Sequence, residues 1–275
     1  MNLKKKDRKG AYVMKPGEAF EIKAFEFLKL TFQNTSFEHK GGMDSTTSDI
    51  AVLKNNKIDF FIEAKDTAAQ SGQFVLLPDT NTKKFIFSPK NCSTPNDITD
   101  IIIQYMDNNF DYFHAAGTAG KILNIPSDIF AKWIIEHYQS RNVKYVISCG
   151  ENFVILPINK FAEYFDITAT YRTKKSGSRK PAQKHINIVK RTIIECYPTA
   201  KFSQQGQKLY MNIDTSINKD HFIIGDYTYY LSKQDNNSYE VRCLSNTYNM
   251  NVIFSIQLKK EQDSSDLTAF KSDLN

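Results

Sequence analysis

The sequence has little cysteine and no long apolar run. Its four cysteines are separated by 47 residues or more, with no CxxC pair and no short His–Cys spacing. This excludes compact zinc motifs and favours buried thiols in a reducing cytosol. No stretch approaches the roughly 18 uncharged apolar residues of a membrane helix, and no apolar region follows the basic start as in a secretory signal. We therefore expect a soluble, cytoplasmic protein with no membrane partner.

Strong net charge is also missing, but the charge is unevenly placed. The chain has 275 residues with 36 basic and 30 acidic side chains, which gives +6, and its 20 Phe and 14 Tyr exclude a disordered chain. Residues 4–9 carry +4 and residues 170–191 carry +8, so the rest sums to −6. The pattern predicts a slightly acidic body with two basic segments that could contact phosphates.

The first strong periodic pattern predicts a helix over residues 18–32. Phe20, Ala24 and Leu28 fall on one broad apolar face, and Glu21 falls inside that face. A carboxylate among core positions requires a reason, such as a catalytic or metal site.

Two β-rich runs, residues 48–53 and 58–65, flank an Asn-Asn turn and predict a hairpin. Residues 67–74 are expected as a loop or short helix. Further expected helices cover 96–106, 127–139 and 160–165, and further strands cover 84–88, 145–148, 153–156, 209–213, 222–224, 228–231, 239–244 and 251–258.

The hairpin brings charged side chains to one end. Alternate residues of a strand share a face, so Glu63 and Lys65 point the same way, and a hairpin closed at the Asn-Asn turn places Asp49 beside them. Two close carboxylates repel each other unless a cation lies between them. Hard oxygen ligands that leave coordination positions open suit Mg²⁺. Lys65 would contact the attacking water or the phosphate, and Glu21 could reach the same cluster. These are the parts that phosphodiester cleavage needs.

The sequence here resembles the PD-(D/E)xK nuclease superfamily, most of all type II restriction endonucleases. The resemblance covers residues 17–74 and rests on Ser48-Asp49-Ile50, Glu63-Ala64-Lys65 and the preceding helix with Glu21. It implies that Asp49 and Glu63 bind Mg²⁺, that Lys65 assists the water and that Glu21 is the helix carboxylate. Gln70 or Gln73 resembles a glutamine that some members place beside the site.

Some assignments stay open. Many members have Pro where this sequence has Ser48, and Asp44 competes with Asp49 for the first carboxylate position. Glu18 could replace Glu21. The five histidines show no ligand spacing, so structural or surface roles are expected for them.

The second basic segment is expected to be a flexible loop that contacts DNA. Its small residues would let the backbone approach phosphates closely. The residues assigned to DNA binding are Arg172, Lys174, Lys175, Ser176, Ser178, Arg179 and Lys180.

The predicted fold class is α/β: a restriction-endonuclease-like core with a central mixed sheet flanked by helices, and a β-rich C-terminal portion. The expected parts are a basic N-terminal arm (1–16), a nuclease core (17–169), a basic DNA-contacting loop (170–191), a β-rich DNA-binding portion (192–260) and a polar, frayed tail (261–275).

The expected function is Mg²⁺-dependent hydrolysis of double-stranded DNA at a specific short sequence. A palindromic target would favour a homodimer. Two alternatives remain: a structure-specific repair or junction-resolving nuclease of the same fold, and a non-catalytic DNA-binding protein.

Overall fold

In the computed structural model the chain divides into two units, which are described separately. Among the described residues, the larger unit comprises those from 16 to 174 and from 249 to 274, and the smaller comprises those from 175 to 248. The structure describes residues 16–40, 48–91, 95–175, 177–215, 217, 221–234, 237–245 and 248–274. No helix in these ranges is long and apolar enough to cross a membrane.

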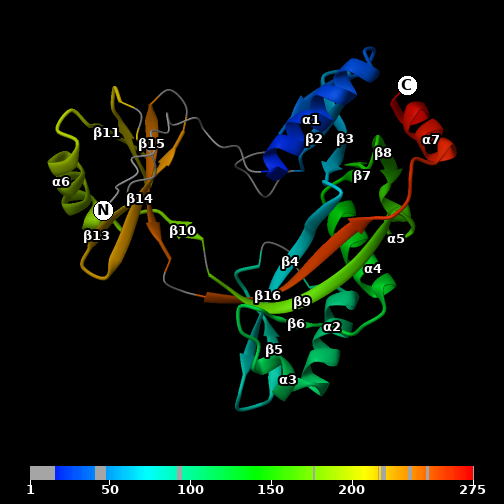
Figure 1. Ribbon diagram of the computed structural model, residues 1–275, viewed down its shortest axis with the longest axis horizontal. Helices are drawn as coiled ribbons and strands as arrows, with labels where there is room; N and C mark the ends of the chain where they lie inside the picture. Colours follow the sequence, from blue (N-terminus) through cyan, green and yellow to red (C-terminus); the bar gives the residue numbers. More distant parts are fainter. Residues whose placement is uncertain are drawn as a thin grey trace, which may run out of the picture. The chain divides into compact units, whose positions relative to one another are not determined.

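A five-stranded mixed sheet forms the first part of the larger unit (Figure 1). The predicted hairpin is present, and both turn residues, Asn55 and Asn56, have positive φ (54° and 60°), as a tight hairpin turn requires. In sheet order the strands are β1 (Ser36–His39), β2 (Ile50–Lys54), β3 (Lys57–Ala64), β7 (Val143–Cys149) and β8 (Phe153–Pro157). Strands β3 and β7 are parallel, and the other neighbouring strands are antiparallel.

Helices cover both faces of this sheet. On one face pack α1 (Pro16–Thr31), through the predicted apolar stripe of Phe20, Ala24 and Leu28, and α7 (Ser264–Leu274), through Phe270. On the other face pack α4 (Ser127–Gln139), the short turn η1 (Ile158–Lys160) and α5 (Phe161–Tyr164). The central mixed sheet flanked by helices therefore agrees with the predicted fold class.

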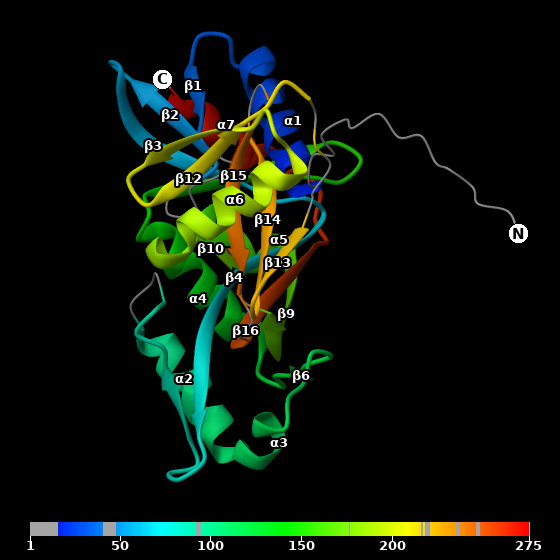
Figure 2. The same cartoon turned by 90° about the vertical axis from the view of Figure 1, so that its left-hand side faces the viewer.

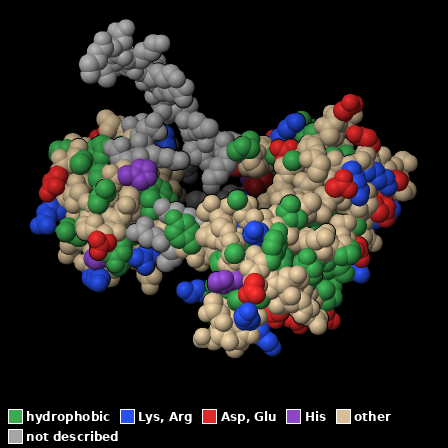
Figure 3. Space-filling model, turned by 60° about the horizontal axis from the view of Figure 1, so that its bottom comes forward, with side chains coloured by type: hydrophobic (Ala, Val, Ile, Leu, Met, Phe, Trp, Pro, Cys, Tyr) green, Lys and Arg blue, Asp and Glu red, His purple; other side chains and the backbone are tan. Residues whose placement is uncertain are grey.

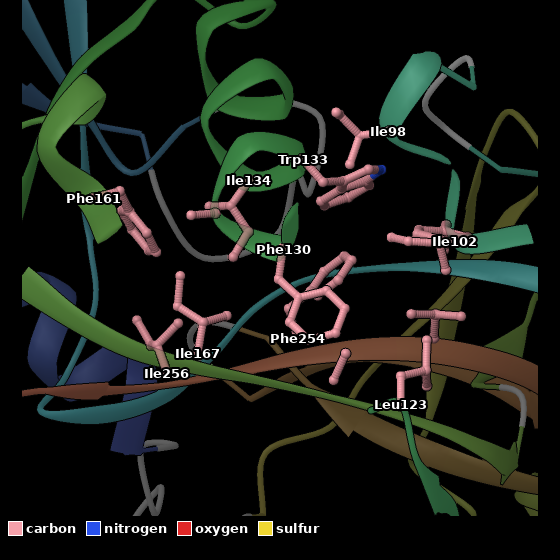
Figure 4. Packing of buried hydrophobic residues seen from close by; sticks show 14 of the residues in the cluster. Ile98, Ile102, Leu123, Phe130, Trp133, Ile134, Phe161, Ile167, Phe254 and Ile256 are labelled. Carbon is pink, nitrogen blue, oxygen red and sulfur yellow. The ribbon is translucent and has the colours of Figure 1, made fainter. Parts of the chain in front are cut away.

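A second five-stranded sheet lies on the far side of α4. Its strands, in order, are β5 (Lys84–Phe87), β4 (Ala68–Asp79), β16 (Tyr248–Leu258), β9 (Phe165–Lys175) and β6 (Lys121–Ile122). One face is covered by α4, α2 (Asp97–Asn108) and α3 (Phe110–His114). Figure 4 shows Phe130 and Trp133 of α4 lying against Phe254 of β16, with Ile98 and Ile102 of α2 beside them. The predicted cap of α2 is present, since the Asn96 side chain accepts from the Thr99 N–H at 2.8 Å.

The smaller unit has its own sheet and core. Helix α6 (Ile186–Cys196), preceded by η2 (Gln183–His185), packs on this sheet (Figure 2). The helix buries Ile186, Val189 and Ile193 with residues of the sheet. The strands are β10 (Ser178–Arg179), β11 (Lys201–Gln205), β12 (Lys208–Asn212), β13 (His221–Ile224), β14 (Tyr227–Lys233) and β15 (Ser238–Leu244), in the order β11-β12-β15-β14-β13 with β10 on β15.

Two local predictions are wrong. Residues 68–74 belong to β4, because this stretch pairs with β16, about 180 residues further along the chain, and no local sequence pattern indicates that partner. Residues 170–191 are not a flexible loop, because buried Tyr171 and Ile186 lie among the lysines and anchor strand β9 and helix α6.

The part boundaries also differ from those predicted. Residues 249–258 return to the larger unit as β16, so residues 192–260 are not one part. Residues 264–274 form α7 rather than a frayed tail, because Phe270 is fully buried. Of the described cysteines, Cys243 is buried, Cys149 is half-buried and Cys196 is exposed, so the thiols are not uniformly buried. The arm at residues 1–15, Asp44 and Ser176 lie outside the described residues.

Candidate active site

Glu63 and Lys65 lie at the carboxyl end of β3, on the face toward α4. The strand alternates as predicted, since Ile62 and Ala64 are buried against the opposite helix layer. The Lys65 ammonium donates a hydrogen bond to Glu63 Oε1 at 2.7 Å. The Lys65 backbone N–H donates to the Ile147 carbonyl at 2.9 Å, which fixes the strand end beside β7.

Asp49 joins them from the residue before β2. Its Oδ2 accepts a hydrogen bond from the Ala64 N–H at 2.9 Å and lies 3.9 Å from Lys65 Nζ. The hairpin therefore places Asp49, Glu63 and Lys65 in one cluster, and their side chains are only 13%, 8% and 16% exposed.

The cluster holds more negative than positive charge. Burial raises the pKa of Asp49 to about 7, and the nearby Glu63 carboxylate adds to the effect. Burial lowers the pKa of Lys65, but the Glu63 and Asp49 carboxylates outweigh it, so the pKa lies well above its ordinary value. Lys65 therefore stays charged, and one ammonium cannot balance both carboxylates.

Glu21 approaches the cluster from α1. Burial raises its pKa, while Lys65 and then His39 act in the opposite direction. Its Oε2 lies 3.7 Å from Nε2 of His39, a β1 residue whose register partner is Ile50, the neighbour of Asp49. Sequence reasoning missed His39, because only the pairing of β1 with β2 brings it here. Glu18 also acts electrostatically on Glu21, from one turn earlier.

Buried polar atoms without a partner gather at this end of the sheet. Within the described ranges, five buried side-chain atoms have no hydrogen-bond partner. One belongs to the cluster, and the others belong to α1, to β1, to β7 and to the residue two positions before β2. Because buried polar groups are normally paired, this group is suited to a bound ion or water. The atoms are Glu21 Oε2, His39 Nε2, Ser48 Oγ, Glu63 Oε2 and Ser148 Oγ.

These residues fit a cation that keeps part of its water shell. Asp49 and Glu63 supply two hard oxygen ligands with excess negative charge, as Mg²⁺ accepts. In the part of the chain that the structure describes, no group of three or more His, Cys, Asp or Glu could hold an ion unaided. Water or substrate oxygens would have to complete the coordination.

Gln70 belongs to another group of residues. Its side-chain amide donates to Gln73 Oε1 at 3.1 Å, and Lys174 Nζ donates to the same oxygen at 3.1 Å. Both glutamines are exposed on the second sheet. Among the described contacts none joins Gln70 to Asp49, Glu63 or Lys65, so the structure does not bring it to the cluster.

The residues assigned to DNA binding are split between the units. Arg172 and Lys174 lie two apart on β9, and burial, followed by repulsion from Arg172, lowers the pKa of Lys174. Ser178, Arg179 and Lys180 lie in the smaller unit with Lys175, whose side chain, like Ser176, is outside the described part.

A network holds β10 in place. Arg242 donates to Ser178 Oγ at 2.6 Å and to the Ser178 carbonyl at 2.9 Å, and it pairs with buried Glu240 at 3.2 Å. Arg179 is exposed, and its guanidinium lies 5.6 Å from the centre of the Tyr227 ring. The fold therefore presents Arg179 from an ordered strand.

Comparison with solved structures gives a close match over most of the chain. No protein family model matches, and neither does any curated protein. A solved structure of HhaI endonuclease in complex with DNA is similar, with 38% sequence identity and a TM-score of 0.76, covering 93% of this chain and 98% of that chain. This likeness confirms the α/β fold class. At this identity over nearly the full length of both proteins, the chain belongs to the restriction endonuclease family that includes HhaI endonuclease.

Proposed function

We propose that this protein is a type II restriction endonuclease of the PD-(D/E)xK kind, which hydrolyses phosphodiester bonds of double-stranded DNA at a specific short sequence and requires Mg²⁺. The observation that carries the proposal is the buried cluster of Asp49, Glu63 and Lys65, whose negative charge exceeds its positive charge. The similar HhaI endonuclease was solved with DNA, which supports DNA as the substrate.

Asp49 and Glu63 would hold the Mg²⁺ ion, with Glu21 acting through a bound water. The ion would make hydroxide available near neutral pH and stabilise charge on the phosphate. The Ala64 N–H orients Asp49, and the Glu63 carboxylate orients Lys65. The Lys65 ammonium then directs the attacking water or contacts a phosphate oxygen.

DNA contacts are assigned to two sets of basic residues. Arg172 and Lys174 act from β9, and Arg179 and Lys180 act from the smaller unit. Each can neutralise a backbone phosphate, which would account for most of the affinity. Ser178 would act by positioning the backbone, since Arg242 already occupies its hydroxyl.

Substitution within the cluster tests the proposal. Asp49→Ala and Lys65→Ala should each lower Mg²⁺-dependent cleavage of plasmid DNA by about 10³-fold or more, because each removes a group at the reacting phosphate. DNA affinity measured by fluorescence anisotropy in Ca²⁺ should change by less than about threefold.

Lys160→Ala is the matched control. Lys160 forms an equally short ion pair with buried Asp266, at 2.6 Å, but that pair anchors α7. Its variant should cleave like wild type. Full activity of Lys65→Ala would refute the catalytic assignment. Discrete fragments from the wild type support restriction, cutting only of branched DNA would indicate a structure-specific nuclease, and binding without cutting would indicate a DNA-binding protein.

A further inference from the structure

A buried tyrosine lies against the catalytic lysine on its α4 side. Tyr138 is 2% exposed, and Lys65 Nζ lies 6.0 Å from the centre of its ring, at the outer limit of a cation–π contact. The Tyr138 hydroxyl lies 3.1 Å from Oγ of Ser71, which is fully buried on β4.

We propose that Tyr138 is a positioning residue for Lys65, and that Ser71 holds Tyr138 in place. The inference rests on the proposed function, because it assigns Tyr138 a role in the reaction of Lys65. It also assigns the second sheet a role at the active site, since Ser71 belongs to that sheet.

The surroundings of the ammonium group support this role. Glu63 accepts one of its hydrogen bonds at 2.7 Å, and Asp49 lies 3.9 Å away. The buried Tyr138 ring occupies space beside the ammonium group, and its negative face favours a nearby cation. Burial, followed by repulsion from Glu63, raises the pKa of Tyr138, so the phenol stays neutral and adds no negative charge.

The position of Ser71 is itself fixed by close packing. The next residue, Gly72, has φ of +113°, and a Cβ there would lie 2.7 Å from the Trp133 ring. Trp133 donates from Nε1 to Thr99 Oγ1 at 3.1 Å, which ties α4 to the start of α2. Strand β4 and helix α4 therefore approach each other closely at the point where Ser71 meets Tyr138.

A double-mutant cycle tests whether the two hydroxyls act together. Tyr138→Phe and Ser71→Ala each remove the same hydrogen bond, and the double variant removes it once. Tyr171→Phe is the matched control, because Tyr171 is equally buried and its hydroxyl donates at 2.9 Å to the Leu76 carbonyl on the same strand as Ser71. Cleavage is measured with Mg²⁺ on the DNA that wild type cuts, with kcat and KM determined separately.

We expect each single variant to lower kcat by about five- to tenfold with KM changed less than twofold, because only the orientation of Lys65 is disturbed. The double variant should be no slower than the singles. Tyr138→Leu, which also removes the ring, should lower kcat further. Tyr171→Phe should lose similar thermal stability but keep the wild-type kcat.

Wild-type kcat in both Tyr138→Phe and Ser71→Ala would overturn the inference, and so would additive losses in the double variant. An equal loss in Tyr171→Phe would also overturn it, because it would reveal a general effect of destabilisation. If Tyr138→Phe fails to fold, Ser71→Ala decides alone by the same kcat criterion. A wild-type protein that does not cleave DNA would instead refute the proposed function.

Discussion

At the scale of single residues, the site depends on charge that is buried without full compensation. Asp49 accepts a backbone hydrogen bond from Ala64 and still has its pKa raised to about 7, because burial and Glu63 outweigh Lys65. A structural ion pair in a core would be balanced, as Lys160 balances Asp266. The imbalance at Asp49 and Glu63 is therefore better explained by a ligand of positive charge than by a contribution to stability.

His137 gives a pH-dependent prediction at this scale. It stacks on Trp133 at 4.9 Å, and burial, followed by repulsion from Arg141, lowers its pKa from 6.5 to about 4. Between those two pH values the unfolded chain binds a proton that the folded chain does not, so stability rises with pH across this window. We expect the wild type to lose about 1–3 kcal/mol from this residue between pH 7 and pH 4.

Urea unfolding of wild type and His137→Gln at pH 4.5 and pH 7 measures this contribution. The variant has no imidazole to protonate, so its stability should fall less toward low pH. Carboxylates change the free energy of unfolding with pH in both proteins alike, so the difference between the two proteins isolates the contribution of His137. An identical pH dependence in both proteins would contradict the assignment.

The sequence indicated the three central site residues but not their environment. Asp49, Glu63 and Lys65 were predictable because a hairpin is local and its alternation fixes which side chains share a face. His39, Ser71 and Tyr138 were not, because each reaches the site through pairing or packing between distant segments. Gln70 was misplaced beside the cluster, since the expected loop or short helix is strand β4, on which Gln70 is exposed and contacts Gln73.

At the scale of elements, local sequence patterns predicted helices and strands correctly, but strand pairing between distant segments was not predicted. The Asn-Asn turn and the Asn96 cap each depend on residues that are close together in the sequence, and both are present as predicted. The small, polar residues of β4 suggested a loop, but pairing with β16 makes them a strand. Helix α6 was missed because lysines masked the spacing of Ile186, Val189 and Ile193.

Gly72 provides the prediction at this scale. Its φ of +113° disfavours any other residue, and an added Cβ would lie 2.7 Å from Trp133. Gly72→Ala should therefore destabilise the protein by about 2–4 kcal/mol in urea unfolding, from backbone strain and overpacking together.

Gly17→Ala is the matched control for that experiment. Gly17 lies in the first turn of α1, and an added Cβ there would meet nothing within 4 Å. The variant should stay within about 1 kcal/mol of wild type, on the stabilising side. A Gly72→Ala protein as stable as Gly17→Ala would show that β4 and α4 can separate without cost.

At the scale of the whole molecule, the basic segment at residues 170–191 is shared between the two units. Residues 170–191 cross from one unit to the other and include a strand and part of a helix, so their eight positive charges do not form one loop. Positive and negative side chains are interspersed on the right-hand side of Figure 3. Among the described residues each chain carries one cluster of the kind formed by Asp49, Glu63 and Lys65, and the homodimer expected for a palindromic target stays a prediction.

The salt dependence of DNA binding tests which basic residues touch phosphate. Each phosphate contact contributes about −0.9 to the slope of log K against log salt, so Arg179→Ala and Lys180→Ala should each reduce the slope by about one. Lys190→Ala is the control, because it removes the same charge from the same unit. Lys190 belongs to α6, and its Nζ lies 5.9 Å from the centre of the Phe202 ring. The slope for this variant, measured by anisotropy between 50 and 200 mM salt, should equal that of wild type. Wild-type slopes for all three variants would mean that Arg179 and Lys180 face solvent and that the DNA is held elsewhere on the molecule.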